Sequence, residues 1–208
     1  MTLVPARLLM LRDVAALRRA GFAVAWNIEL RRTAASEVSF GRECSMARYS
    51  ILHVEGGRLH LGDRVSFGVG NYVAAAESQI TVGSGVLFSP FVSLIALNHQ
   101  IDALGVPLWA ESDHSRSGIS IGDDCWLATR SIVLPGVTLG NRCVVGAGAV
   151  VTKSFPDGTR LAGVPARAIP PGSEHPRRHA DNGRSGGDVA GNDGAGTDDR
   201  PLSDRHAG

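Results

Sequence analysis

The sequence predicts an all-β solenoid, a parallel β-helix, with a helical segment before it and a disordered tail after it. Three observations predict this fold class. Apolar residues recur at every sixth position, glycine often follows them, and the chain holds 26 glycines but only 5% aromatic residues. A period of six fits neither an α-helix nor a long flat strand, so it indicates short strands separated by tight corners.

The six-residue period is regular over most of the chain. Its apolar positions are Phe40, Met46, Leu52, Leu61, Phe67, Val73, Val82, Phe88, Leu94, Ile121, Leu127, Val133, Leu139, Val145 and Val151. Three periods make one triangular coil, and stacked coils lie about 4.8 Å apart, the spacing of paired strands. Each coil then buries its apolar positions against the next coil, as in a solenoid. A β-sandwich, with strands roughly every 8–12 residues, does not fit so constant a period.

Three regions follow from the limits of the repeat. Residues 38–169 form the β-helix, with a loop at 100–120. Residues 1–37 form an N-terminal cap, because 6–32 look helical and a repeat array needs its open end covered. The basic side chains of this segment leave contact with a membrane surface as the alternative. Residues 170–208 hold almost no large apolar side chains and are predicted to be a disordered tail.

Composition excludes several classes of protein. The net charge of +1 gives no electrostatic case for nucleic-acid binding. The first residues lack a proper signal peptide, and no apolar segment reaches the roughly 18 residues that span a bilayer. Three cysteines are too few for a disulfide scaffold. We therefore expect a soluble cytoplasmic protein without a membrane span.

The cysteines share one place in the repeat. Cys44, Cys125 and Cys143 all occupy the fifth position of a six-residue unit, and the last two are 18 residues apart. This spacing predicts small buried residues stacked on one side of the coil. It argues against a covalent acyl-cysteine intermediate.

The repeat breaks at a histidine. The period fails after Leu94 and resumes at Ile121, with His99 at the root of the interruption. Solenoids accept insertions at their corners, where these often line a binding face, and a loop as long as 100–120 is commonly functional. His99 is therefore a candidate catalytic residue held by a rigid coil. An exposed corner histidine is the alternative.

A metal site is not expected. His53, His60 and His114 stand away from the root of the insertion and are predicted to be surface residues. Zinc held by three histidines would need companions for His99, and its own coil supplies none at a useful spacing.

The C-terminal part of the repeat carries recognisable motifs. Residues 121–169 read IGDDCWLATRSIVLPGVTLGNRCVVGAGAVVTKSFPDGTRLAGVPARAI. They closely resemble the hexapeptide-repeat acyltransferases, especially the galactoside, maltose and exopolysaccharide O-acetyltransferase branch. The resemblance runs from about residue 38 to 169. It implies a left-handed β-helix, a homotrimer, and acetyl-CoA bound in the groove between neighbouring subunits.

The resemblance also implies roles for individual residues. His99, which precedes the protruding loop, would be the general base that takes a proton from a sugar hydroxyl as it attacks the thioester. The positions that match acetyl-CoA-binding residues are Trp126, Thr129, Ala147, Thr152, Lys153 and Arg167. In this pattern Lys153 and Arg167 would contact phosphates.

The chain departs from the family pattern in three places. Ala128 replaces the glycine that usually follows the tryptophan, and Pro170 stands where a basic residue is common. An asparagine that often helps at the sugar site is Gly68 here, which leaves Asn71 as the nearest candidate for substrate binding. As a fifth-place residue, Asn71 could instead point inwards.

The predicted function is acetyl-CoA-dependent O-acetylation of a sugar or glycan-precursor hydroxyl by direct transfer. Asp102, Glu111 or Asp113 could orient His99, and the sequence does not choose among them. Three alternatives stay open: N-acetylation of an amino-sugar nucleotide, a β-helix scaffold without catalysis, and a zinc hydratase. The last is disfavoured by the missing histidines.

Overall fold

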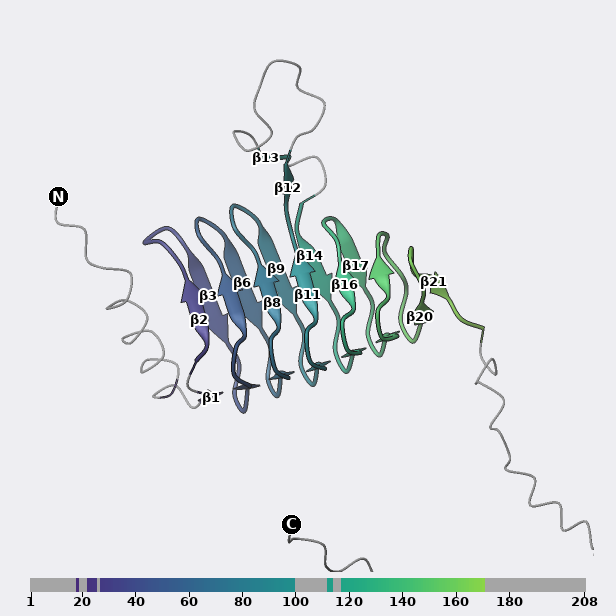
Figure 1. Ribbon diagram of the computed structural model, residues 1–208, viewed down its shortest axis with the longest axis horizontal. Coiled ribbons are helices and arrows are strands. Elements are labelled where there is room, and N and C mark those ends of the chain that lie inside the picture. Colours follow the sequence, from purple (N-terminus) through teal and green to yellow (C-terminus); the bar gives the residue numbers. More distant parts are fainter. Residues whose placement is uncertain (1–17, 19–21, 26, 100–111, 114–116, 171–208) are drawn as a thin grey trace, which may run out of the picture. The chain divides into compact units, whose positions relative to one another are not determined.

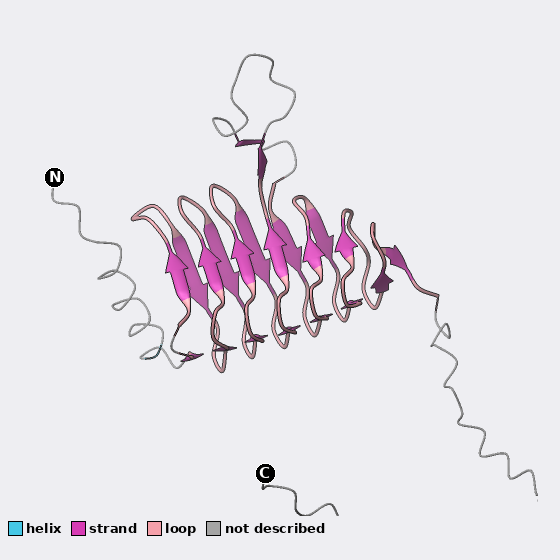
Figure 2. Cartoon of the chain, viewed as in Figure 1, coloured by secondary structure: helices cyan, strands magenta, loops and turns pink. Residues whose placement is uncertain are grey.

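The computed structural model describes residues 18, 22–25, 27–99, 112–113 and 117–170 (Figure 1). These residues form a parallel β-solenoid whose short strands stack coil upon coil (Figure 2). The predicted fold class is confirmed. Among the described residues there is no helix with the length and apolar character needed to cross a bilayer.

Three sheets, which we call A, B and C, make the sides of the coil; they are parallel except at the end of sheet A, where the last two strands are antiparallel. Sheet A contains β1 (Ala23–Val24), β4 (Ser45–Met46), β7 (Ser66–Phe67), β10 (Leu87–Phe88), β15 (Trp126–Leu127), β18 (Val144–Val145), β20 (Arg160–Ala162) and β21 (Arg167–Ala168). Sheet B contains β2 (Glu29–Arg31), β5 (Ile51–His53), β8 (Tyr72–Ala74), β11 (Ser93–Ile95), β16 (Ile132–Val133) and β19 (Val150–Val151). Sheet C contains β3 (Glu37–Phe40), β6 (Arg58–Leu61), β9 (Gln79–Val82), β14 (Ile119–Ile121) and β17 (Val137–Leu139).

The chain visits the sheets in the order C, A, B, and each corner is named by the two sheets it joins. Strands of successive coils pair in register, so that Leu61 lies between Phe40 and Val82 in sheet C. Side chains alternate between the interior and the outer face. The apolar positions of the repeat therefore form columns inside the solenoid, and Leu61, Val82 and Leu94 are fully buried.

The fifth-place residues also point inwards. Cys44, Cys125 and Cys143 are buried, as predicted, and none forms a disulfide. Their thiols donate to backbone carbonyls of the next coil, for example Cys125 Sγ to Gly140 O at 3.1 Å. Inside the solenoid the rings of Phe67 and Phe88 stack with centroids 4.4 Å apart.

The N-terminal expectation needs correction. The segment 6–32 was expected to be helical. Arg18 is helical, but Ala23–Val24 and Glu29–Arg31 form β1 and β2, which pair with β4 and β5 of the next coil. Strands that pair with the solenoid are thus present before residue 38. Residues 1–17, 19–21 and 26 lie outside the described residues, as does the predicted tail beyond Pro170.

The insertion leaves the solenoid at a B–C corner. Beyond β11 the chain forms β12 (Asn98–His99), which pairs antiparallel with β13 (Ser112–Asp113). Figure 1 shows this hairpin projecting from the stack of coils. The loop ends earlier than residue 120, because Ile119 already lies in β14.

Candidate active site

His99 lies in the first strand of the hairpin that leaves the solenoid. Its backbone is paired with Ser112, and its side chain is exposed. The sequence predicted that a rigid coil holds His99, whereas the structure places the residue beyond the coil, in a two-residue strand of the hairpin.

A cavity of about 520 Å³ adjoins His99 on the sheet B side of the corner. Its described lining residues are His53, Glu55, Tyr72, Ala74, Ala76, Glu77, Ile95, Leu97, Asn98 and His99. The volume is in the range of small-molecule sites. Because Ala74 and Ala76 have small side chains, space remains between the hairpin and the earlier coil that carries His53.

Three polar side chains of this cavity form a chain of contacts. His53 Nδ1 lies 3.4 Å from the Tyr72 hydroxyl, and His53 Nε2 lies 3.5 Å from Glu55 Oε2. The His53 side chain is only 24% exposed. With its proton on Nε2, the imidazole can donate to the Glu55 carboxylate and accept from the Tyr72 hydroxyl.

His53 is the residue that sequence reasoning missed. It was expected to be a separate surface histidine, yet it lines the same cavity as His99. In sheet B it pairs with Ala74, which pairs in turn with Ile95, the last strand residue before the hairpin. Counting coils back from the insertion would have revealed this column.

Trp126 lies on another side of the solenoid, on the outer face of sheet A. Its ring is 46% exposed, and its Nε1–H donates to the Ser89 hydroxyl at 3.0 Å. Leu87, the strand neighbour of Trp126, is 47% exposed. Two large apolar side chains thus stand side by side on an outer face.

Three more of the predicted cofactor residues lie near this face. Thr129 and Ala147 occupy the A–B corners of adjacent coils, where Gly148 N–H donates to Thr129 O at 2.9 Å. Both residues are exposed, and so is Arg167 in β21, beside Ala162 at the end of sheet A. Trp126, Thr129, Ala147 and Arg167 thus form one row of exposed residues along sheet A and its A–B corner.

Thr152 and Lys153 do not join that row. They follow β19 of sheet B and belong to a B–C corner. Lys153 is exposed, with its Nζ 5.5 Å from the centre of the Phe155 ring. The structure therefore divides the predicted cofactor residues between two corners of one chain, and sheet B separates them.

The assignment of Asn71 to substrate binding is not supported. Asn71 is 1% exposed and points into the solenoid. Its Nδ2 donates to Gly68 O at 2.6 Å, and its Oδ1 accepts from Val92 N–H at 2.9 Å. Because both ends of the amide are used inside the coil, Asn71 has a structural role.

The acidic residues that could orient His99 lie mostly outside the described residues. Asp102 and Glu111 lie outside them, as does His114, and of Asp113 only the backbone pairing with Asn98 is described. His60 is on sheet C, where its Nδ1 lies 2.8 Å from Ser39 Oγ. In the part of the chain that the structure describes, no group of three His, Cys, Asp or Glu side chains could hold a metal ion.

Cys125 is unsuited to nucleophilic chemistry. Burial raises the pKa of its thiol to about 11, and burial also raises the pKa values of Cys44 and Cys143. A thiol attacks as its thiolate, which is scarce at neutral pH when the pKa is high. The expectation against an acyl-cysteine intermediate agrees with this environment.

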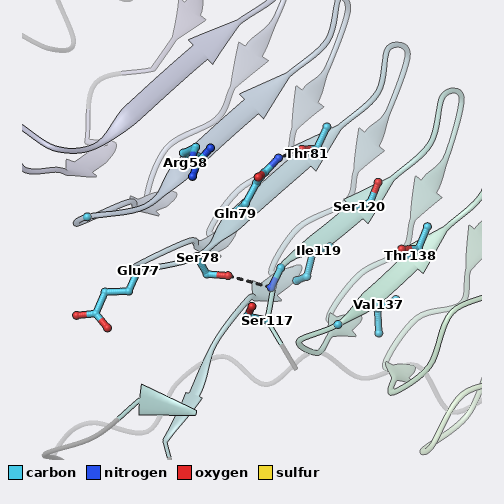
Figure 3. Close-up of a pocket in the computed structure, with 13 residues that line it drawn as sticks. Arg58, Glu77, Ser78, Gln79, Thr81, Ser117, Ile119, Ser120, Val137 and Thr138 are labelled. Carbon is cyan, nitrogen blue, oxygen red and sulfur yellow. Dashed lines mark hydrogen bonds between the residues drawn. The ribbon is translucent and has the colours of Figure 1, made fainter. Parts of the chain in front are cut away.

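A second cavity of about 540 Å³ lies on the outer face of sheet C, on the far side of the same corner (Figure 3). Arg58, Gln79, Thr81, Ser120 and Thr138 line it from successive strands. Glu77 lines both cavities, so the hairpin root lies between them.

Part of the chain matches a known family model. Residues 118–153 match the model described as "Bacterial transferase hexapeptide (six repeats)". The match agrees with the coil geometry of these residues, and the sequence relatives of the chain are named acetyltransferases.

Two relatives and one solved structure narrow the similarity. The galactoside O-acetyltransferase of Escherichia coli (strain K12) is 32% identical over 114 residues, which cover 55% of this chain and 54% of the relative. The putative lipopolysaccharide biosynthesis O-acetyl transferase WbbJ of the same organism is 29% identical over 62% of this chain and 80% of the relative. A structure of galactoside acetyltransferase in complex with coenzyme A gives a TM-score of 0.53 and 25% identity, covering 80% of this chain and 72% of that one.

The resemblance to the galactoside-type branch is thus confirmed. The chain spans about half the length of the curated relatives it matches first, between 42% and 54% of each.

Proposed function

We propose that the protein is an acetyl-CoA-dependent O-acetyltransferase that acts on a hydroxyl group of a sugar or glycan precursor, with His99 as the general base. The observation that carries the proposal is the position of His99, which lies on a hairpin over a cavity of about 520 Å³ lined by other polar side chains. The names of the relatives support the choice of acetyl group and of hydroxyl acceptor.

The reaction needs one proton acceptor and no covalent enzyme intermediate. The acceptor oxygen attacks the thioester carbon while the His99 imidazole takes the hydroxyl proton. The new C–O bond forms, the C–S bond breaks, and the imidazolium returns the proton to the leaving thiolate. The products are the acetyl ester and coenzyme A with a free thiol.

The division of the candidate residues supports a site shared between copies of the chain. Trp126, Thr129 and Ala147 lie along sheet A and its A–B corner, whereas His99 belongs to a B–C corner. A single copy therefore offers the proposed base and the main row of cofactor residues on different sides. In a homotrimer with acetyl-CoA between subunits, one copy would supply the base and its neighbour the row.

The outer face of sheet B favours the same arrangement. Among its outward side chains are Ile51, Ile132 and Val150, which are half-buried in one copy. Apolar side chains on an outer face are typical of subunit contacts. We assign this face to the interface.

The cavity beside His99 favours an uncharged acceptor. The carboxylates of Glu55 and Glu77 line it, while no Lys or Arg is among its described lining residues. Carboxylate oxygens accept hydrogen bonds from sugar hydroxyls but repel an anionic group. A neutral sugar therefore fits better than a uronic acid or a sugar phosphate.

The first test is the release of free coenzyme A thiol from acetyl-CoA with pooled hydroxyl and amine acceptors. We expect release that depends on a hydroxyl acceptor and falls at least about 100-fold in His99→Ala, the range of general-base catalysis. Equal release by both proteins would exclude His99 as the base. Release only with amines would favour N-acetylation, and acetyl-CoA binding without any release would favour a scaffold.

Solution mass and subunit mixing test whether the site is shared between copies of the chain. Solution mass should show a trimer, and a stable monomer with full activity would contradict the intersubunit arrangement. Mixing His99→Ala with Trp126→Ala subunits should then restore part of the activity, because some interfaces would combine an intact His99 with an intact Trp126.

A further inference from the structure

We propose that Ser78 is a positioning residue for His99: its hydroxyl joins the two ends of the inserted hairpin to the preceding coil and so fixes the direction in which the hairpin leaves the solenoid. This inference rests on the proposed function for its catalytic consequence. Nothing in the repeat pattern of the sequence distinguishes Ser78 from any other small corner residue.

The B–C corners of successive coils share one hydrogen-bonded turn. After β5, Gly57 N–H donates to Val54 O at 2.9 Å, and after β8 Ser78 N–H donates to Ala75 O at 3.0 Å. After β11, Gly118 N–H donates to Ala96 O, also at 3.0 Å. Residues 97–117 therefore replace the two residues that stand between the bonded pair in the other corners.

The coil itself continues across this root without interruption. Ala96 N–H donates to Ala74 O on the preceding coil, and Gly136 N–H on the following coil donates to Gly118 O. Ala96 is fully buried. The coil bonds at the root are thus those of an uninterrupted solenoid, and contacts beyond them bear on the direction of the hairpin.

Ser78 supplies such a contact. Its Oγ–H donates to Ala96 O at 3.0 Å, and its Oγ accepts from Gly118 N–H at 2.9 Å. Figure 3 shows the Ser78 side chain reaching across to the next coil. One hydroxyl thus bonds the last residue before the insertion and the first residue after it.

The residues that make the same turn bond on either side of Ser78 are Gly57 and Gly118, which have no side chain. A Cβ at Gly57 would lie 1.7 Å from Ala75 O, so that corner accepts only glycine. At the corner before Gly57, the Ser36 hydroxyl accepts from Gly56 N–H of the next coil at 3.1 Å, but no insertion stands there. His99 stands three residues beyond Ala96, and a tilt at the root is carried directly to its imidazole.

The chain offers a matched control in Ser50. Its Oγ–H donates to Gly68 O at 3.2 Å and its Oγ accepts from Asn71 N–H at 3.2 Å, so it makes the same pair of bonds to the next coil. The corner that Ser50 joins carries no insertion. Ser50→Ala therefore removes the same chemistry without touching the hairpin.

The experiment compares Ser78→Ala, Ser78→Thr and Ser50→Ala in the full chain. We expect kcat of Ser78→Ala to fall about 10- to 100-fold with the KM for acetyl-CoA within about 2-fold, because misplacement of a reacting group by about 1 Å costs up to 10²-fold. Ser78→Thr keeps the hydroxyl and should retain most of kcat. Ser50→Ala should lower Tm by at least as much as Ser78→Ala and leave kcat near the wild-type value.

Amide hydrogen exchange at Asn98, His99 and Gly118 supplies a readout that does not need turnover. We expect faster exchange at these amides in Ser78→Ala and unchanged exchange there in Ser50→Ala. Unaltered kcat and exchange in Ser78→Ala would overturn the inference, and so would an equal loss of kcat in Ser50→Ala. If the wild type shows no transfer to any acceptor, the proposed function fails. Unaltered exchange at the hairpin amides in Ser78→Ala would then refute the positioning role of Ser78 independently.

Discussion

The indole N–H of Trp126 donates to the hydroxyl of Ser89, 3.0 Å away on the preceding coil, although the ring is 46% exposed. The bond fixes the orientation of a large apolar surface before any ligand arrives. A ring held in one rotamer loses less conformational entropy on binding than a mobile one. This pairing supports the proposal that the outer face of sheet A binds acetyl-CoA.

Removal of the Ser89 hydroxyl should weaken cofactor binding without unfolding the protein. We expect Ser89→Ala to raise the KM for acetyl-CoA about 2- to 5-fold, the effect of one hydrogen bond. Trp126→Ala should raise it about 10-fold or more, because the contact surface itself is lost. Thermal unfolding should change little in either variant. A normal KM in Trp126→Ala would remove the sheet A face from the proposed cofactor site.

Asn71 should matter for stability and not for substrate. Asn71→Ala leaves Val92 N–H without its partner inside the coil, and it removes one of the two side-chain donors to Gly68 O, which keeps the Ser50 hydroxyl. Because one unsatisfied buried group costs about 1–3 kcal/mol, we expect the free energy of unfolding to fall by about that amount in urea titration. Ser120→Ala, on the exposed face of sheet C, is the control and should change it by less than about 0.5 kcal/mol.

An equally stable Asn71→Ala variant with a raised KM for the acceptor would contradict the structural role. Asn71→Asp gives a second check, because a carboxylate can still accept from Val92 N–H but cannot donate to Gly68 O. It should destabilise the coil most at pH values where the carboxylate is ionised.

The buried thiol of Cys125 makes stability depend on alkaline pH. Its folded pKa of about 11 lies above the ordinary value of 9.0, because burial disfavours the thiolate. Its contribution to stability is therefore fully present below pH 9 and is lost as the pH rises toward 11. We expect the free energy of unfolding to decline over this window, and less steeply in Cys125→Ala.

Alkylation tests the same environment. Iodoacetamide at pH 8 should label the cysteines of the unfolded chain rapidly and Cys125 of the folded chain very slowly. Rapid labelling of folded Cys125, with loss of transferase activity, would show that this thiol is reactive after all.

Glu55 should influence which acceptors are used. Its side chain is 53% exposed and lies 3.5 Å from His53 across the cavity beside His99. We expect Glu55→Gln to raise kcat/KM for a uronic-acid acceptor about 3- to 10-fold relative to the matched neutral sugar, which corresponds to roughly 1 kcal/mol for a partly exposed charge. Glu43→Gln, at an exposed corner of β3 and β4, is the control for the change of net charge. Unchanged selectivity in Glu55→Gln would show that the cavity does not read acceptor charge.

The solenoid was predictable because its cause is periodic and local. Apolar side chains such as Leu61 and Val82 are stabilised by burial, and a short strand followed by a corner buries one of them every six residues. The break at His99 was visible for the same reason, since an insertion is conspicuous only against a regular pattern. The buried cysteines followed from their constant place in the repeat.

What the tertiary structure decided concerns residues whose surroundings come from other coils. Ala23–Val24 is too short to be recognised alone and becomes a strand only because Ser45–Met46 lies beside it. The Asn71 amide points inwards, where it donates to Gly68 O and accepts from Val92 N–H. His53 reaches the cavity of His99 through the stacking of coils, and Ser78 meets Ala96 and Gly118 only when the corner closes. The sequence by itself determined the coil, because burial of a repeated residue needs no distant partner, whereas the site depends on contacts between coils that only the folded stack creates.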